Sequence, residues 1–178
     1  MRRRRFLNSA SLLGLLPASA LATSSNTGKL KDCLTHLETR NAAPAFSLDS
    51  TNGGKVSLSD FDGKVLIVNF WATGCPPCRQ EMPSLQRLWR TLQPDGVELV
   101  AIDFGDPPAP VQEFAREANI QFPLLLDPLG ETVRAYGVVG LPTTFVVDRQ
   151  GQVAIKATGE RDWDAQRIVD AIRKLAQE

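Results

Sequence analysis

Two cysteines lie three positions apart, and both residues between them are proline: Cys75-Pro76-Pro77-Cys78. Since a thiolate attacks a disulfide, one thiol of such a pair can form a mixed disulfide and the other can resolve it. The nearly continuous apolar run 65–71 precedes the pair, and apolar residues at helical spacing follow it. The pair is therefore predicted to lie where a buried strand passes into a helix.

Cys75 is predicted to be the N-cap of this helix. Proline is tolerated in the first turn, because the N–H groups there have no partner inside the helix. Cys78 then supplies the first free N–H, which can point back at the sulfur of Cys75. That N–H and the partial positive charge of the helix end both favour the thiolate of Cys75. We expect Cys75 to be the nucleophile and Cys78 to be the resolving, more buried cysteine.

A metal site and an inert cysteine pair are the alternatives. Cys33 and His36 have the same spacing as the pair, so the chain contains four candidate zinc ligands. The two prolines and the strand-to-helix setting instead favour a redox pair. The total of three cysteines also argues against a structural disulfide framework. We expect no metal, a lone thiol at Cys33 and a solvated His36.

The remainder of the chain alternates between strand and helix patterns. Strands are expected at 46–48, 55–58, 65–71, 97–102, 122–126, 143–147 and 152–157, and helices at 75–92, 111–118, 131–136 and 164–176. Turn signals at 52–54 and 148–151 predict two hairpins. The segment 105–110, which holds three prolines, is expected to be a rigid loop. The alternation predicts an α/β sheet covered on both faces.

Residues 1–22 have the layout of an export signal. Four arginines at 2–5 precede a short apolar run, and small residues precede a cleavage point after Ala22. The arginines with Phe6 and Leu7 also resemble a twin-arginine motif, so this route and the general secretory route are both open. The run is too short and interrupted to anchor the chain permanently. We expect a polar tail over 23–42 and one domain over 43–178.

Charge excludes one class of partner. The formal net charge is zero, and removal of the four arginines leaves 16 basic and 20 acidic side chains. The chain has no excess of basic residues, so its charge gives no indication of a nucleic-acid partner.

The segment from Phe70 to Pro83 resembles the TlpA-like (ResA-type) branch of the thioredoxin superfamily, and the segment from Gly140 to Phe145 does so too. The resemblance covers roughly residues 42–175. It implies a thioredoxin fold: a central mixed β-sheet flanked by helices, with an N-terminal β-hairpin and a central βα-type insertion. It also implies a periplasmic thiol–disulfide oxidoreductase without a cofactor, which reduces client proteins and draws electrons from a membrane donor.

The resemblance further implies which residues meet a substrate. The matching proline of the superfamily, here Pro142, is cis and lies beside the cysteines. Leu141 would then offer its backbone N–H and C=O to an extended segment of the client. Trp71, packed beside the disulfide, and the two prolines Pro76 and Pro77 complete the expected substrate contacts.

A buried acid is implied as well. Thioredoxins proper place an aspartate at the position of Asn69, whereas the TlpA-like branch places a glutamate one turn after the second cysteine. Here this is Glu81, at i+3 from Cys78 on the same helix face. We expect Glu81 to be partly buried, with a raised pKa, and to accept the proton of Cys78. The alternative is a surface residue favoured by the helix dipole. Trp89 and Trp163 are expected to serve packing.

Two other functions compete with disulfide reduction. A peroxiredoxin-type peroxidase shares the fold, but such enzymes place Thr or Ser where this chain has Ala72. A non-enzymatic metal carrier would use the cysteine pair with Cys33 or His36.

Two departures from the family, Gly74 in place of an aromatic residue and Thr143 after Pro142, leave the client undetermined.

Overall fold

The computed structural model describes residues 34–178. Its eight strands form one sheet in the order β1-β8-β7-β4-β5-β6-β2-β3. They are β1 (Thr35–His36), β2 (Ser47–Ser50), β3 (Lys55–Ser57), β4 (Val65–Trp71), β5 (Val97–Phe104), β6 (Leu124–Asp127), β7 (Thr143–Val147) and β8 (Val153–Thr158). The neighbours β4, β5 and β6 are parallel, and the other pairs are antiparallel. The sheet is therefore mixed, as expected.

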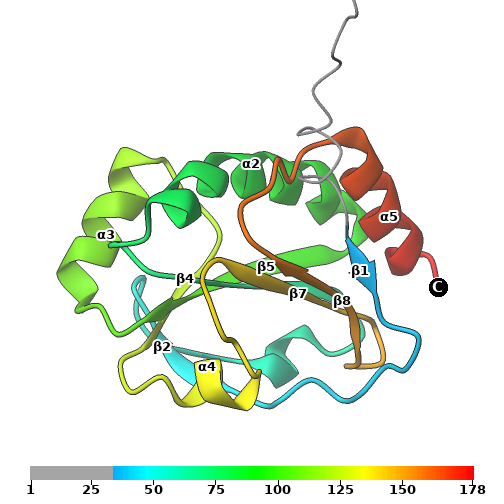
Figure 1. The fold of residues 1–178 in the computed structure, drawn as a ribbon, viewed down its shortest axis with the longest axis horizontal. Helices are drawn as coiled ribbons and strands as arrows, with labels where there is room; N and C mark the ends of the chain where they lie inside the picture. The colour runs from blue at the N-terminus through cyan, green and yellow to red at the C-terminus, as the bar shows by residue number, and fades with distance from the viewer. Residues whose placement is uncertain (1–33) are drawn as a thin grey trace, which may run out of the picture.

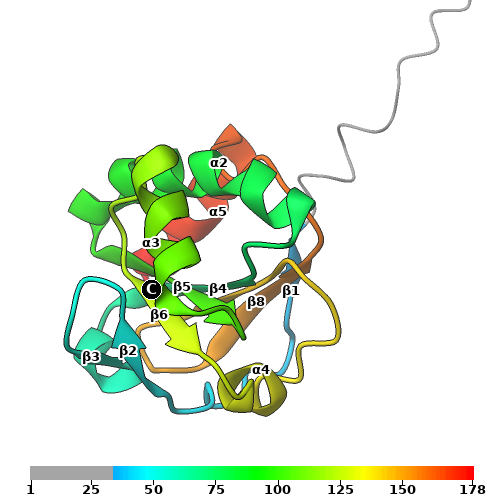
Figure 2. The same cartoon turned by 90° about the vertical axis from the view of Figure 1, so that its left-hand side faces the viewer.

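Helices cover both faces of the sheet (Figures 1 and 2). Helices α2 (Pro76–Leu92), α3 (Pro108–Glu117) and α5 (Gln166–Ala176) lie on one face. Helix α4 (Glu131–Ala135) and the short 3-10 helix η1 (Leu58–Phe61) lie on the other, and a second 3-10 helix, η2 (Gln93–Asp95), follows α2. The predicted hairpins are confirmed as β2–β3 and β7–β8.

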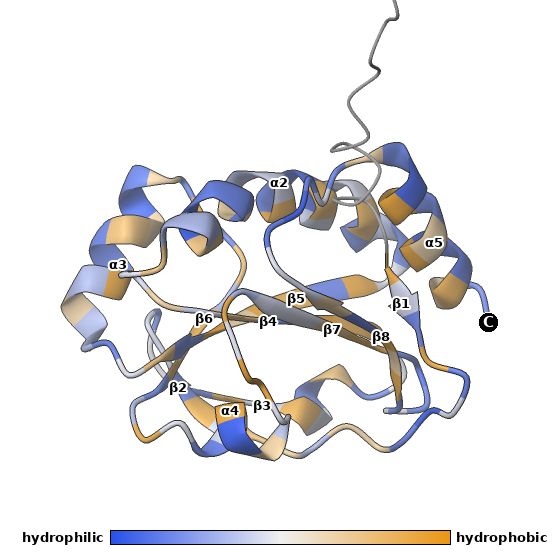
Figure 3. Cartoon of the chain, viewed as in Figure 1, coloured by the Kyte–Doolittle hydropathy of each residue, from blue (hydrophilic) through white to orange (hydrophobic). Residues whose placement is uncertain are grey.

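Strand β4 separates two hydrophobic cores. Alternate residues of a strand point to opposite faces, and both faces of this one are buried. Val65, Ile67 and Trp71 contribute to the core under α2, α3 and α5, whereas Leu66, Val68 and Phe70 contribute to the core on the α4 side. Two-sided burial explains the continuous apolar run in the sequence. Figure 3 shows the matching apolar sides of the helices turned toward the sheet.

Three of the differences from the sequence-based boundaries have a clear physical reason. Helix α3 begins at Pro108, inside the segment 105–110 predicted to be a loop, because proline is accommodated in a first helical turn. Strand β5 continues to Phe104, since its parallel pairing with β6 extends that far. The sheet also begins inside the expected tail 23–42, where Thr35 pairs with Lys156 of β8.

Some expectations lie outside the described residues. These are the export signal over 1–22 and the thiol of Cys33. Within residues 34–178, no helix has the length and apolar character needed to cross a membrane.

Candidate active site

A disulfide joins Cys75 and Cys78 where β4 passes into α2. The two Cα atoms are 5.3 Å apart. Cys75 is the N-cap of α2, and its Sγ accepts a hydrogen bond from the backbone N–H of Cys78 at 3.4 Å. Cys78 is fully buried, whereas Cys75 is only partly buried. The predicted N-cap and the predicted difference in burial are both confirmed.

A shallow groove lies beside the partly exposed cysteine. It is lined by Thr73, Gly74, Pro76, Arg79 and Gln80. A Cβ atom built on Gly74 would meet no atom within 4 Å, so the missing side chain leaves open space in front of the disulfide. The guanidinium of Arg79 lies 5.0 Å from the centre of the Phe114 ring, so the groove has a cationic wall.

Glu81 lies in the interior, one helical turn after Cys78, and is only 2% exposed. Its Oε1 accepts a hydrogen bond from Asn69 Nδ2 at 2.8 Å. Its Oε2 accepts from Trp163 Nε1 at 3.0 Å and from the backbone N–H of Arg161 at 3.1 Å. Three donors therefore surround this carboxyl group. One is the amide of Asn69 on β4, and the other two, the backbone N–H of Arg161 and the indole of Trp163, come from the segment before α5.

Burial raises the pKa of Glu81 to about 7, from an ordinary value of 4.5. The hydrogen bonds from Trp163, Asn69 and Arg161 oppose this rise, because they stabilise the charged form. Desolvation outweighs them. The expected burial and raised pKa are thus confirmed, and the alternative of a solvent-exposed glutamate is wrong.

The structure assigns contacts to two residues that the sequence suggested only in part. Trp163 is buried as expected for packing, but its indole N–H also binds the carboxyl of Glu81. Asn69 donates to Thr144 Oγ1 at 2.9 Å as well as to Glu81. The available signal was chemical: a buried indole or amide needs a hydrogen-bond partner.

The segment before β7 lies at the same end of the sheet as the disulfide, since Thr143 pairs with Phe70 near the end of β4. The peptide bond between Leu141 and Pro142 is cis, as expected. Pro142 is buried, and its carbonyl accepts from the N–H of Gly159 at 2.8 Å. Among the described residues, the backbone of Leu141 takes part in no backbone–backbone hydrogen bond.

The remaining expected substrate contacts divide into two kinds. Pro76 is exposed and Pro77 is partly buried, so both prolines border the surface. Trp71, in contrast, is fully buried and packs against Phe114 with ring centres 4.9 Å apart. Trp71 therefore supports the site from below and presents no surface to a substrate.

Metal ligation finds no support in the described residues. His36 is exposed on β1, which β8 and β7 separate from β4 and its cysteines. Residues 34–178 contain no group of three His, Cys, Asp or Glu side chains able to hold a metal ion. The structure therefore does not bring His36 to the pair.

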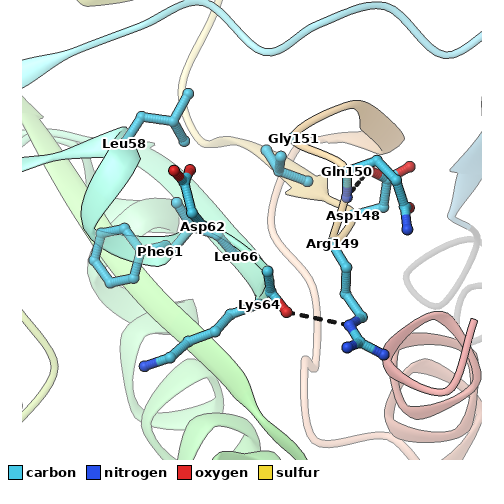
Figure 4. A pocket seen from close by; sticks show the side chains of 11 residues that line it. Leu58, Phe61, Asp62, Lys64, Leu66, Asp148, Arg149, Gln150 and Gly151 are labelled. Atoms are coloured by element: carbon cyan, nitrogen blue, oxygen red, sulfur yellow. Dashed lines mark hydrogen bonds between the residues drawn. The ribbon is translucent and has the colours of Figure 1, made fainter.

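A further hollow lies at the opposite end of the sheet, where β4 begins and β7 ends (Figure 4). Arg149 crosses it and donates through Nε to the carbonyl of Gly63 at 3.1 Å. Because β4 runs from this hollow toward Cys75, the hollow does not belong to the site of the disulfide.

Comparisons with known proteins agree with this geometry. Residues 39–156 match the AhpC/TSA family. The thiol-disulfide oxidoreductase ResA of Geobacillus kaustophilus is 34% identical over 172 residues, which cover 96% of this chain and 97% of that protein. ResA of Bacillus subtilis is 34% identical over 158 residues, which cover 89% and 87%.

Solved structures give the same result. A secreted thiol-disulfide isomerase from Corynebacterium glutamicum superposes with a TM-score of 0.73 at 29% identity, over 82% of this chain and 92% of that one. A thiol:disulfide interchange protein of the thioredoxin family from Chlorobium tepidum TLS gives 0.68 at 32% identity, over 77% and 99%. With its fold, its cysteine pair and these relatives, the chain belongs to the AhpC/TSA family, among the thiol–disulfide oxidoreductases of the ResA type.

Proposed function

We propose that this oxidoreductase works as an exported reductase, which passes two electrons from the Cys75–Cys78 dithiol to disulfides of client proteins. The observation that carries the proposal is the buried carboxyl of Glu81, one turn beyond the buried Cys78. A resolving thiol without solvent access needs a proton acceptor inside the protein. A carboxyl group with a pKa of about 7 can serve as that acceptor near neutral pH.

The reaction has two steps. The Cys75 thiolate attacks a client disulfide, forms a mixed disulfide and releases the first client sulfur as a thiolate. Cys78 then gives its proton to the carboxylate of Glu81 and attacks the sulfur of Cys75. This attack releases the second client thiolate and leaves the Cys75–Cys78 disulfide. Two electrons pass to the client, and the released client thiolates take up protons from water.

The hydrogen-bond partners of Glu81 suit a carboxylate, although its burial favours the neutral acid. All three neighbours of its oxygens donate hydrogen bonds, and a protonated carboxyl would need an acceptor. Asn69 Oδ1 is buried without a partner among the described residues. A half-turn of the Asn69 amide would present that oxygen to a protonated Glu81. We infer that the amide follows the proton during turnover.

The client is proposed to bind along the free backbone of Leu141. An extended client segment would pair with that backbone as an added strand. The exposed Pro76 and the open space at Gly74 would let the client sulfur approach Cys75. Trp71 would act from the protein interior, by fixing the position of the loop that carries Cys75. Because the groove is open and shallow, a folded client surface can reach it without an insertion into a deep pocket.

Export and the electron source are the remaining parts of the proposal. Support for export comes from the arginine-rich start of the sequence and from a secreted relative among the solved structures. The enzyme would require re-reduction after each turnover. A membrane protein that relays electrons outward would supply them.

The reduction potential of the Cys75–Cys78 disulfide tests the direction of electron flow. Full-length protein would be equilibrated with glutathione and dithiothreitol buffers. A potential of about −270 mV, as in thioredoxin, supports a reductase. A value of about −120 mV would contradict it, since that potential is typical of a disulfide donor. A parallel assay of peroxide consumption separates the peroxidase alternative.

A further inference from the structure

A second buried carboxyl lies at the active-site end of the sheet, on Asp103 of β5. Asp103 pairs with Trp71 across the β4–β5 ladder, and it is fully buried. Its Oδ1 accepts a hydrogen bond from the backbone N–H of Asp106 at 3.0 Å. Its Oδ2 accepts no hydrogen bond from any of the described residues. Because a buried carboxylate oxygen without a partner is costly, this atom is expected to carry a proton.

Asp106 connects Asp103 to the loop before the cysteines. Its Oδ2 accepts a hydrogen bond from the backbone N–H of Thr73 at 2.7 Å. Thr73 lies two residues before Cys75, and the loop 72–74 sets where helix α2 begins. Two successive hydrogen bonds therefore join the end of β5 to the loop that carries the nucleophile.

The two carboxyl groups also act on each other. Burial raises the pKa of Asp103 to about 7, and the charge of Asp106 contributes to the rise. Burial acts on Asp106 too, but hydrogen bonds from Thr73 and Asp103 outweigh it and lower the pKa of Asp106. Adjacent carboxyl groups resist double ionisation, so the pair holds one proton between them up to about pH 7.

The charged groups on the elements that pack around Asp103 have other partners or are exposed to solvent. Strand β4 carries none. On α2, Glu81 has its own three donors and Arg79 lies over the Phe114 ring. Asp127 of β6 accepts from the backbone N–H groups of Glu131 and Val133. The charged residues of α3 are exposed: Glu113, Arg116 and Glu117.

We propose that Asp103 is a positioning residue for the nucleophile: its protonated carboxyl donates to Asp106, which holds the Thr73 amide and with it Cys75. Loss of this proton places two carboxylates face to face and removes the hydrogen bond between them. The loop then loosens. A second negative charge near the sulfur also disfavours the Cys75 thiolate. This inference rests on the dithiol chemistry of the proposed function, but not on the direction of electron flow.

Direct titration is the first test. The carboxyl carbon of Asp103 would be followed by NMR between pH 3 and 9 in the oxidised full-length protein, where Cys75 and Cys78 do not titrate. We expect a midpoint near 7 for Asp103 and a lower one for Asp106. A midpoint of Asp103 near the ordinary value of 3.8 would overturn the proposal.

The second test separates positioning from structure. Iodoacetamide alkylation of Cys75 would be measured from pH 5 to 9 in a Glu81→Gln background, so that Glu81 cannot contribute. In the Glu81→Gln protein, the alkylation rate plotted against pH should show a step near pH 7, in addition to the step caused by ionisation of the Cys75 thiol itself. Asp103→Asn, a neutral donor of similar shape, should abolish this step and retain protection of the Thr73 amide. Asp62→Asn, at an exposed loop position, is the matched control and should keep the step.

A third variant reports on the hydrogen bonds alone. Asp103→Leu should lose the step and also accelerate hydrogen exchange of the Thr73 amide by about tenfold or more. Persistence of the step in Asp103→Asn contradicts the proposal. So does unchanged Thr73 exchange in a folded Asp103→Leu protein. Neither readout depends on the reduction potential, so the outcome is independent of whether the enzyme reduces or oxidises its clients.

Discussion

Asn69 Nδ2 lies 2.8 Å from Glu81 Oε1, so a side chain of β4 holds the carboxyl group of α2 in place behind the disulfide. By the resemblance to the thioredoxin superfamily, Asn69 occupies the position at which thioredoxins proper carry a proton-accepting aspartate. In this chain the buried carboxyl group is on helix α2, and strand β4 supplies an amide that binds it.

Replacement of Glu81 by glutamine should slow resolution of the mixed disulfide. The variant keeps the size of the side chain but removes the proton acceptor, so we expect release of the second client thiol to slow by about a hundredfold. Formation of the mixed disulfide should change much less. Stopped-flow quenching with a disulfide peptide distinguishes the two steps. Glu113→Gln, at an exposed position on α3, is the control. Equal resolution rates in both variants would contradict the role of Glu81.

Stability of the oxidised protein should fall as pH rises from about 4.5 to 7. The folded protein retains the proton of Glu81 up to about pH 7, whereas the unfolded chain releases it near 4.5. The folded state therefore binds more protons in this window, and the free energy of unfolding decreases with pH. A shift of this size corresponds to about 3 kcal/mol. Urea unfolding at pH 4.5 and 8 measures it, and Glu81→Gln should remove that part of the pH dependence. An equal dependence in the variant would contradict the assignment.

Loss of the Trp163 indole N–H should raise the pKa of Glu81 further. Trp163→Phe removes the largest of the hydrogen bonds that stabilise the carboxylate. The pH midpoint of the resolution step should therefore move upward. Trp89→Phe is a matched control, because the indole N–H of Trp89 has no hydrogen-bond partner among the described residues. Equal midpoints in both variants would show that the contact to Glu81 is without effect.

Two glycines allow the free-energy cost of a left-handed backbone conformation to be separated from the cost of a steric clash. Gly130 and Gly137 both have left-handed φ values, 66° and 61°. A Cβ on Gly130 would lie 2.5 Å from Cε2 of Phe104, whereas one on Gly137 would meet nothing within 4 Å. We expect Gly137→Ala to cost about 1 kcal/mol from the backbone alone. Gly130→Ala should cost more, and Phe104→Ala in the same chain should recover the difference. Thermal unfolding checks both, and equal costs would contradict the predicted clash.

Local patterns predicted much of the fold. The strand 65–71 was predicted with its observed limits, because burial on both faces leaves an uninterrupted apolar run. The start of α2 was also predictable, since two prolines after an N-cap cysteine are accommodated in a first helical turn and helical apolar spacing follows them. The start of α3 was missed because its prolines suggested a loop, although the same rule applies to them.

Sequence alone determined the chemical class of this protein: the spacing of Cys75 and Cys78 and their place at a helix start predict a thiol–disulfide couple. The tertiary structure decided the electrostatics of the site. Asn69, Trp163 and the backbone of Arg161 are far from Glu81 in the chain, and only the packing of α2 on the sheet brings them to its carboxyl. Asp103 gave no pattern at all, since an acid at the end of a strand is ordinary until its surroundings are known. The burial of a polar side chain depends on every element that packs around it, and the spacing of residues along the chain does not encode it.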